Sequence, residues 1–194
     1  MNLEQSPPGE APPAQEPIEP HQARLLSEMR GWARDVFFAV GTAIVIVVFF
    51  YQPVKVEGTS MLPELVDQER IFVNKFLYRI DQIERGDIVV FWYPLDPTKS
   101  YIKRIVGLPG DVVDVQEGEV VVNGQALDED YLPANFFDRR SFSPVYVEPG
   151  HYYVLGDHRN QSNDSRMWGL VPDQNIYGKA VFRYWPVKKM GSID

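Results

Sequence analysis

A serine and a lysine, each in a dense local sequence, are the residues of this chain best suited to chemistry. Ser60 lies within the run Gly58 to Pro63, and Lys103 lies within the run Tyr101 to Asp111. A serine hydroxyl becomes an effective nucleophile when a nearby base removes its proton, and a lysine amine can be that base once burial lowers its pKa. Serine and lysine form one known variant of the acyl-transfer site. The pair therefore predicts nucleophilic catalysis by Ser60 with Lys103 as the general base.

The segment around Lys103 alternates as a β-strand does. A period of two places Tyr101, Lys103 and Ile105 on the same face of the strand. If that face is covered, desolvation disfavours the ammonium form and lowers the lysine pKa. Taken alone, this segment fits a solvated strand lysine better, because lysine is mostly exposed. Ser60 taken alone likewise fits an ordinary turn before proline.

A third segment, from Gly156 to Gly169, is too polar for a core and is dense in side chains that can fix one another. Ordinary solvated loops share this composition, so the segment alone leaves function open. A Ser-His-Asp triad through Asp157 and His158 is another reading. Adjacent residues rarely orient one imidazole ring productively, which argues against that triad.

Composition excludes several classes of function. The 194 residues contain no cysteine, which removes disulfides, thiolate metal sites and a cysteine nucleophile. The three histidines are scattered without a paired ligand spacing, so neither a metal site nor a cofactor is expected. A formal charge of −8 and the lack of a basic, aromatic stretch argue against nucleic-acid binding.

The front of the chain predicts a tail followed by a membrane anchor. Residues 1–31 are expected to form a disordered, proline-rich tail, with six prolines in the first twenty residues. The run from Val36 to Tyr51 contains sixteen residues without a charge, which as a helix span about 24 Å of a hydrocarbon core roughly 30 Å thick. We expect a transmembrane helix over residues 32–52. A buried core helix and a cleavable signal peptide are the alternatives that fit less well.

The distribution of basic residues predicts the orientation of this anchor. Arg24, Arg30 and Arg34 precede the run, whereas Lys55 and Arg70 follow it within a similar distance. The positive-inside rule therefore favours a cytoplasmic N-terminus and an exported body.

The body, residues 53–194, is predicted to be a mainly antiparallel β domain. Short strands separated by Gly, Pro and Asp are expected, and one short helix is expected within Glu64 to Leu77. Asn123-Gly124 predicts a hairpin turn, since type I′ turns require positive φ at both central residues. The expected strands are Ile71–Val73, Ile88–Trp92, Tyr101–Val106, Val112–Val115, Glu119–Val122, Tyr152–Leu155 and Lys179–Tyr184.

Together, these segments resemble the bacterial-type (type I) signal peptidases, membrane-anchored proteases that remove signal peptides from exported preproteins. The motifs occur in family order: Ser-Met-x-Pro, Gly-Asp-Ile-Val-Val-Phe, Tyr-Ile-Lys-Arg-x-Val-Gly-Leu-Pro-Gly-Asp, and Gly-Asp-x-Arg-x-x-Ser-x-Asp-Ser-Arg-x-Trp-Gly. The match covers about residues 54 to 186 and the preceding anchor.

The resemblance implies a role for each site residue. Ser60 is expected to be the nucleophile and Lys103 the general base, with the hydroxyl of Ser162 orienting the lysine amine. Asp164 and Arg166 are expected to form a supporting ion pair, and Asp157 and Arg159 to help hold the same turn. Some family members carry an oxyanion-binding serine where this chain has Gly58, so the backbone N–H of Ser60 becomes the main expected donor. Glu64 replaces a more common threonine, and His158 a more common asparagine.

The resemblance also implies the substrate and the location. An extended preprotein segment is expected to add as a strand between Val54–Gly58 and the strand of Lys103, with shallow pockets for small residues in an Ala-x-Ala pattern. Val54, Val56, Leu65 and Ile102 are the expected pocket walls. The bilayer near the export machinery is the expected setting, in the plasma membrane or a thylakoid. LexA-type self-cleaving proteases and an inactive, anchored peptide-binding module are the alternative classes.

Overall fold

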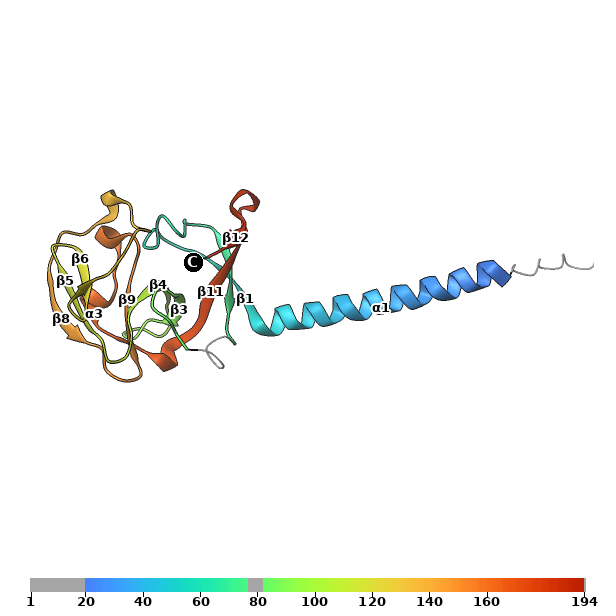
Figure 1. Cartoon of the computed structure of the whole chain (residues 1–194), viewed down its shortest axis with the longest axis horizontal. Helices are drawn as coiled ribbons and strands as arrows, with labels where there is room; N and C mark the ends of the chain where they lie inside the picture. The colour runs from blue at the N-terminus through green and yellow to red at the C-terminus, as the bar shows by residue number, and fades with distance from the viewer. Residues whose placement is uncertain (1–19, 77–81, 194) are drawn as a thin grey trace, which may run out of the picture. The chain divides into compact units, whose positions relative to one another are not determined.

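The computed structural model describes residues 20–76 and 82–193, in two compact units that divide between Val45 and Ile46. Helix α1 spans Pro20–Phe50 (Figure 1). It begins at a proline, which suits the first turn of a helix, and the chain leaves it three residues before Pro53. Residues 20–31, which the sequence predicts to be disordered, are thus helical. The helix-favouring stretch after Pro20 continues into the apolar run, which explains the difference. The rest of the expected tail lies outside the described residues.

The expected anchor overlaps this helix with different bounds. Helix α1 ends at Phe50 and strand β1 begins at Tyr51, so the last two residues of the predicted span are extended. Within residues 20–76 and 82–193, no helix combines the length and the apolar character that crossing a membrane requires.

The body contains a large antiparallel sheet of eight strands, in which the order β1-β2-β11-β3-β4-β9-β10 is extended by β12 pairing with β11. All of its strand pairs are antiparallel. The strands are β1 (Tyr51–Lys55), β2 (Arg70–Asn74), β3 (Ile88–Trp92), β4 (Ser100–Gly107), β9 (His151–Leu155), β10 (Val171–Pro172), β11 (Ile176–Trp185) and β12 (Gly191–Ser192).

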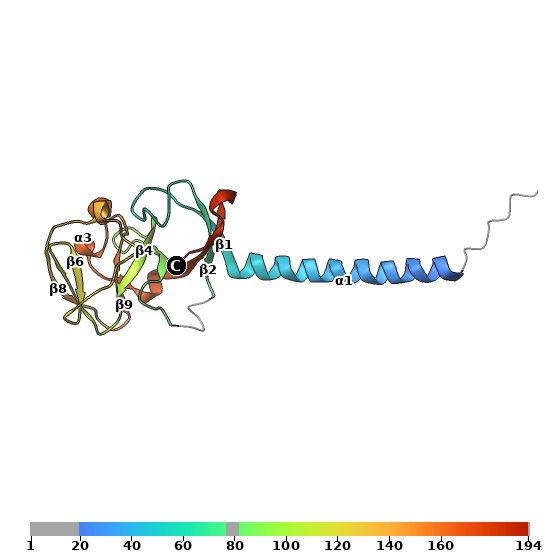
Figure 2. The same ribbon diagram turned by 45° about the horizontal axis from the view of Figure 1, so that its top comes forward.

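A second antiparallel sheet of four strands has the order β7-β6-β5-β8. It lies at the opposite end of the body from β1 in both ribbon views (Figures 1 and 2). Its strands are β5 (Val112–Gln116), β6 (Glu119–Val122), β7 (Gln125–Ala126) and β8 (Phe142–Tyr146). Between β6 and β7, Asn123 and Gly124 have φ values of 54° and 80°, which confirms the predicted hairpin turn.

All seven predicted strands lie within observed strands, and the mainly antiparallel β architecture is confirmed. The helix expected within Glu64 to Leu77 is wrong over the described residues 64–76, which form turns and then β2. Gln68 has a φ of 70° and donates its N–H to the carbonyl of Val56 at 2.9 Å, so this backbone bonds across the fold and not along a helix. The helical segments of the body are η1 (Ala134–Phe136), η2 (Arg159–Gln161), α3 (Ser165–Trp168), η3 (Asp173–Asn175) and η4 (Val187–Lys189).

Both faces of the central strands are covered. On β3, Ile88 and Val90 pack into one hydrophobic cluster, while Val89 and Phe91 pack into another on the opposite face. The same alternation on β4 sends Ile102 to the first cluster and Tyr101 and Ile105 to the second. A lysine between Tyr101 and Ile105 therefore enters an apolar layer.

Candidate active site

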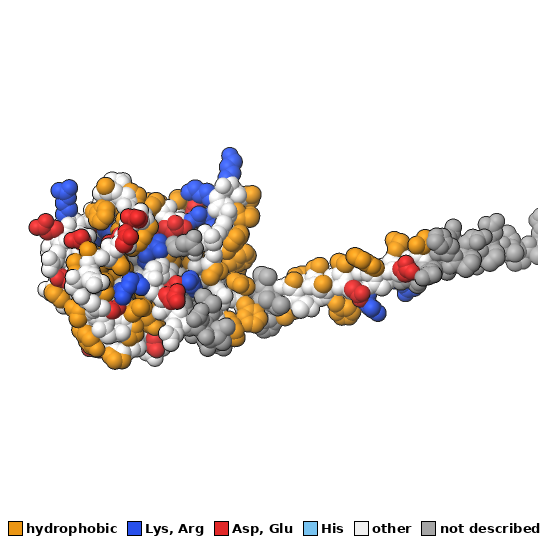
Figure 3. Space-filling view, viewed as in Figure 1, with side chains coloured by type: hydrophobic (Ala, Val, Ile, Leu, Met, Phe, Trp, Pro, Cys, Tyr) orange, Lys and Arg blue, Asp and Glu red, His pale blue; other side chains and the backbone are white. Residues whose placement is uncertain are grey.

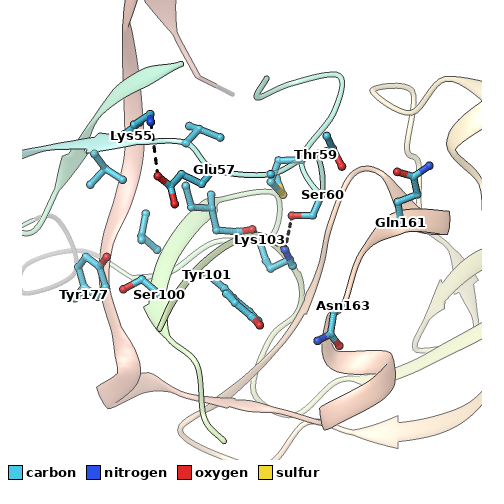
Figure 4. Close-up of a pocket in the computed structure, with 16 residues that line it drawn as sticks. Lys55, Glu57, Thr59, Ser60, Ser100, Tyr101, Lys103, Gln161, Asn163 and Tyr177 are labelled. Atoms are coloured by element: carbon cyan, nitrogen blue, oxygen red, sulfur yellow. Dashed lines mark hydrogen bonds and ion pairs between the residues drawn. The ribbon is translucent and has the colours of Figure 1, made fainter. Parts of the chain in front are cut away.

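The turn after β1 and the middle of β4 bring Ser60 and Lys103 together. Lys103 Nζ lies 2.6 Å from Ser60 Oγ and donates a second hydrogen bond of 3.1 Å to the carbonyl of Ile102 (Figure 4). The two residues are 43 positions apart in the chain, so the fold, and not local sequence, makes this contact. At that separation the amine can exchange a proton with the hydroxyl directly.

Burial prepares Lys103 to act as a base. Its side chain is on the face of Tyr101, with Nζ 5.5 Å from the ring centroid, and only 4% of the residue is exposed. Desolvation lowers the pKa of Lys103 to about 8, although Asp164 and Asp157 act in the opposite direction. The face of Lys103 is therefore covered, which is the condition for a lowered lysine pKa, and not solvated as this segment alone suggested.

The loop after β9 holds the turn of Ser60. The backbone N–H of His158 donates to the carbonyl of Ser60 at 3.0 Å, and Nδ1 of His158 lies 3.1 Å from the carbonyl of Thr59. Gly156 lies so close that a Cβ built there would be 2.5 Å from the carbonyl oxygen of Ser60. The nucleophile's backbone is therefore pinned against a glycine that has no room for a side chain.

The alternative triad through Asp157 and His158 does not form. Asp157 makes a two-pronged ion pair with Arg104, with oxygen–nitrogen distances of 3.0 and 2.9 Å. Both side chains are buried, and Arg104 follows Lys103 on β4. Nδ1 of His158 faces Thr59, and no described contact joins the imidazole to Asp157 or to the hydroxyl of Ser60. The imidazole therefore braces the loop, and the amine alone is placed to take the proton.

The predicted ion pair between Asp164 and Arg166 is present. Nε and Nη2 of Arg166 each lie 2.8 Å from one carboxylate oxygen of Asp164, which also accepts the backbone N–H of Gly156 at 3.1 Å. Arg166 extends this support to Asp138 at 3.0 Å and to the carbonyl of Arg159 at 2.7 Å. The pair thus fixes Gly156, and through it the turn of the nucleophile.

Sequence reasoning missed two acidic partners of this loop. Asp138 pairs with Arg166, and Glu129 forms a buried ion pair with Arg159 that includes a 2.9 Å contact at Nη1. Each partner is 28 or 30 residues from its arginine. No periodicity or local motif links positions so far apart, so the sequence carried no signal for either pair.

Ser162 does not make the predicted hydrogen bond to the amine of Lys103 in this structure. Its Oγ is buried and has no hydrogen-bond partner within the described part of the chain. It packs against Gly156, where an added Cβ would clash with it. A buried hydroxyl without a partner is unusual, and this one approaches the same side of Gly156 as the carbonyl of Ser60. Its expected role in orienting the lysine amine stays a prediction.

The backbone after Gly58 leaves the amide of Ser60 available. Gly58 has a φ of 92° and donates its N–H to Asp67 at 2.8 Å, a hydrogen bond that lowers the pKa of that carboxyl. In the described residues the N–H of Ser60 has no acceptor. A developing oxyanion on a substrate carbonyl held at Ser60 Oγ would therefore meet the Ser60 amide first.

A groove of about 490 Å³ leads to Ser60 and Lys103. Of the four expected walls, Val54, Val56 and Ile102 line the groove. Leu65 does not, because its N–H closes a turn onto the carbonyl of Met61 at 2.8 Å and its side chain is fully buried in the core. The described residues contain no group of three or more side chains suited to holding a metal ion.

Two unpaired strand edges border this groove. On one side, β1 pairs with β2 and has no strand partner on its other edge among the described residues. On the other side, β4 pairs with β3 along Ser100 to Arg104, but its pairing with β9 begins only at Arg104. Among the described residues, positions 100–103 therefore have no strand partner on this edge, where the carbonyl of Ile102 accepts only from Lys103 Nζ, and such an edge can add an extended peptide as a strand.

Known proteins are similar to this chain in sequence. Residues 29–185 match the family described as signal peptidase, peptidase S26. A signal peptidase I of Leptolyngbya laminosa is 37% identical, covering 97% of this chain and 94% of its own length. A probable signal peptidase I-2 of a Synechocystis strain is 43% identical, covering 80% and 72%. A crystal structure of a signal peptidase I from Enterococcus faecalis aligns with a TM-score of 0.46 and 31% identity, over 52% of this chain and 97% of its own. The chain therefore belongs to the signal peptidase family, peptidase S26.

Proposed function

We propose that this protein is a serine endopeptidase that removes N-terminal signal peptides from exported preproteins, with Ser60 as nucleophile and Lys103 as general base. The observation that carries the proposal is the 2.6 Å contact between Lys103 Nζ and Ser60 Oγ inside a buried site. The kinship with signal peptidases I supports the choice of substrate.

The chemistry follows from the protonation state of the amine. Neutral Lys103 takes the proton of Ser60 as its Oγ attacks the scissile carbonyl, and the resulting ammonium then protonates the departing amine. The Ser60 N–H stabilises the negative charge on the tetrahedral intermediate. In the second half, Lys103 removes a proton from water, which hydrolyses the ester on Ser60 and frees the signal peptide.

The supporting residues act through position. The ion pair of Asp164 and Arg166 fixes the loop at Gly156, and Gly58 provides the φ of 92° from which the chain turns toward Ser60. Ser162 orients the lysine amine once the substrate is bound. Catalytic hydrogen bonds often form or tighten only in the substrate complex, which is consistent with the unpartnered hydroxyl of Ser162 in the structure.

The groove supports recognition by strand addition. A preprotein segment that precedes the cleaved bond lies between β1 and residues 100–103 of β4 and bonds to both free edges. Val54, Val56 and Ile102 leave shallow apolar pockets, which suit small side chains at the first and third positions before the cut. These two positions share one face of an extended peptide.

The test is cleavage of a purified preprotein whose signal peptide ends in Ala-x-Ala. We expect a single cut after the final alanine, with kcat/KM reduced at least about tenfold when that alanine is replaced by phenylalanine. N-terminal sequencing of the product and initial rates provide the measurement. No cut by the unaltered protein would instead favour an inactive peptide-binding module.

The same assay carries a pH prediction. Because the neutral fraction of an amine with a pKa of about 8 is roughly one tenth at pH 7 and nine tenths at pH 9, kcat/KM should rise about tenfold over this interval. The rate constant kcat/KM rises with pH because only the deprotonated amine of Lys103 is a base, and burial brings its pKa down into this pH interval. A flat profile would contradict the role of Lys103.

Residues 32–52 are proposed to anchor the chain in the plasma membrane, with a thylakoid membrane as the other location. The support is the uncharged run Val36 to Tyr51 and the exposure of the large apolar side chains in its first ten residues. The large apolar side chains of α1 between Val36 and Val45 are 52–74% exposed (Figure 3). Within the described residues no helix joins the length and the hydropathy that a span requires.

Protease protection in sealed vesicles tests this anchor and its orientation. With residues 53–194 on the exported side, inside-out vesicles should protect the body from added protease until detergent is added. The body should also stay with the vesicles after alkaline carbonate extraction. Digestion of the body without detergent would reverse the orientation, and release by carbonate would remove the anchor.

A further inference from the structure

The apolar face of the groove continues past its end into a pair of aromatic rings. Tyr177 on β11 lines the groove, and the ring of Trp92 lies 4.8 Å from it, centroid to centroid, at an angle of 35°. Trp92 is the last residue of β3 and is 43% exposed. Its carbonyl accepts a hydrogen bond of 3.1 Å from the side chain of Asn175, which fixes the strand end.

These two rings share the face that the groove uses. On β3, alternation places Trp92 on the side of Ile88 and Val90, and both of those belong to the hydrophobic cluster that Val54 and Ile102 cover. Tyr177 packs against the same cluster. In the close-up, Tyr177 lies beside Ser100 at the end of the groove away from Ser60 (Figure 4). The aromatic pair is therefore a continuation of the substrate path.

The strand spacing identifies which substrate residue reaches the pair. Trp92 is opposite Ser100, three residues before Lys103 on β4, which is a distance of about 10 Å along a strand. A peptide with its cleaved bond at Ser60 therefore brings its fourth and fifth residues before that bond to this level. The fifth shares a face with the first and third, so its side chain points toward the rings.

Resting on the proposed function, we propose that Trp92 and Tyr177 form a specificity-determining subsite for a large apolar side chain at the fifth position before the cleaved bond. The chemistry of the subsite is apolar, and the neighbouring Lys99 is already paired with Asp96 at 2.9 Å. A signal peptide has an apolar segment that ends shortly before its cleavage site, so such a side chain is available at this distance.

Two matched preproteins test the subsite, one with leucine and one with serine at the fifth position. The unaltered protein should cleave the leucine substrate with a kcat/KM about tenfold higher, as expected for burying one large aliphatic side chain in a partly open site. In Tyr177→Ala and in Trp92→Ala this ratio should fall to below about twofold. The ratio is compared within each variant, so a general loss of activity does not imitate the result.

Two control variants accompany the test. Tyr177→Phe keeps the ring and should keep the ratio. Trp185→Ala removes another exposed tryptophan that does not line the groove and should leave both rates unchanged. A ratio near one in the unaltered protein, or a preserved ratio in both alanine variants, overturns the subsite while leaving the proposed function standing. Failure of the unaltered protein to cleave either substrate removes both.

Discussion

Lys103→Arg should reduce kcat/KM for preprotein cleavage by at least about 10³-fold, and Ser60→Ala should do the same. Arginine keeps a long, basic side chain, but its guanidinium stays protonated at any pH at which the protein is folded, so it cannot take the proton of Ser60. Alanine at position 60 removes the attacking atom. The rates are measured with the preprotein that ends in Ala-x-Ala.

A third variant separates this chemical loss from unfolding. Lys103→Met has a similar length and no charge, and it should be as inactive as the arginine variant. At pH 7, below its pKa of about 8, Lys103 is mostly in the ammonium form, which burial disfavours. The methionine variant has no such charge, so at pH 7 it should unfold at a temperature no lower than that of the unaltered protein. Full turnover in any of these three variants would refute the assignment of the pair.

Gly156→Ala should lower kcat by about 10²-fold, although no reacting atom is removed. The added Cβ would stand 2.5 Å from the carbonyl oxygen of Ser60 and would also clash with the side chain of Ser162. The obstacle at Ser60 is backbone, so the turn of the nucleophile must move. A shift of about 1 Å at a reacting atom is sufficient for a loss of this size.

Gly191→Ala is the matched control for this substitution. It also lies in the body, on β12, but a Cβ at Gly191 meets no atom within 4 Å and its backbone is not in the left-handed region. We expect its activity to be unchanged and its free energy of unfolding to differ by less than about 0.5 kcal/mol. If Gly156→Ala were as active as Gly191→Ala, the close packing of the loop against Ser60 would have no catalytic consequence.

Local patterns were sufficient for the strands and for the strand face that carries Lys103, although the local segment alone favoured a solvated lysine over the buried one observed. Alternation over Tyr101 to Val106 predicted the face of Lys103, and the structure covers that face with Tyr101 and Ile105. The Asn123-Gly124 turn followed from dihedral preference alone. Both features depend on residues a few positions apart, which is the range over which sequence periodicity carries information.

The remaining errors arise where a contact that no periodicity predicts decides the outcome. The helix expected after Glu64 is replaced by turns because the backbone of Gln68 bonds to Val56 and the N–H of Val66 bonds to the carboxylate of Glu69 at 3.0 Å. Glu129 was overlooked since its arginine is 30 residues away. Leu65 was placed in the substrate pocket, whereas the turn after Ser60 directs it into the core.

The two free strand edges beside the groove have a consequence for solubility. An open edge normally invites the sheet of a second molecule, which leads to aggregation. In this body the edges of β1 and of residues 100–103 border one narrow channel, so each restricts access to the other. We expect a groove of about 490 Å³ to admit a single extended segment more readily than a folded sheet. The pair of strand edges that binds an extended peptide thus also disfavours association between two molecules of the protein.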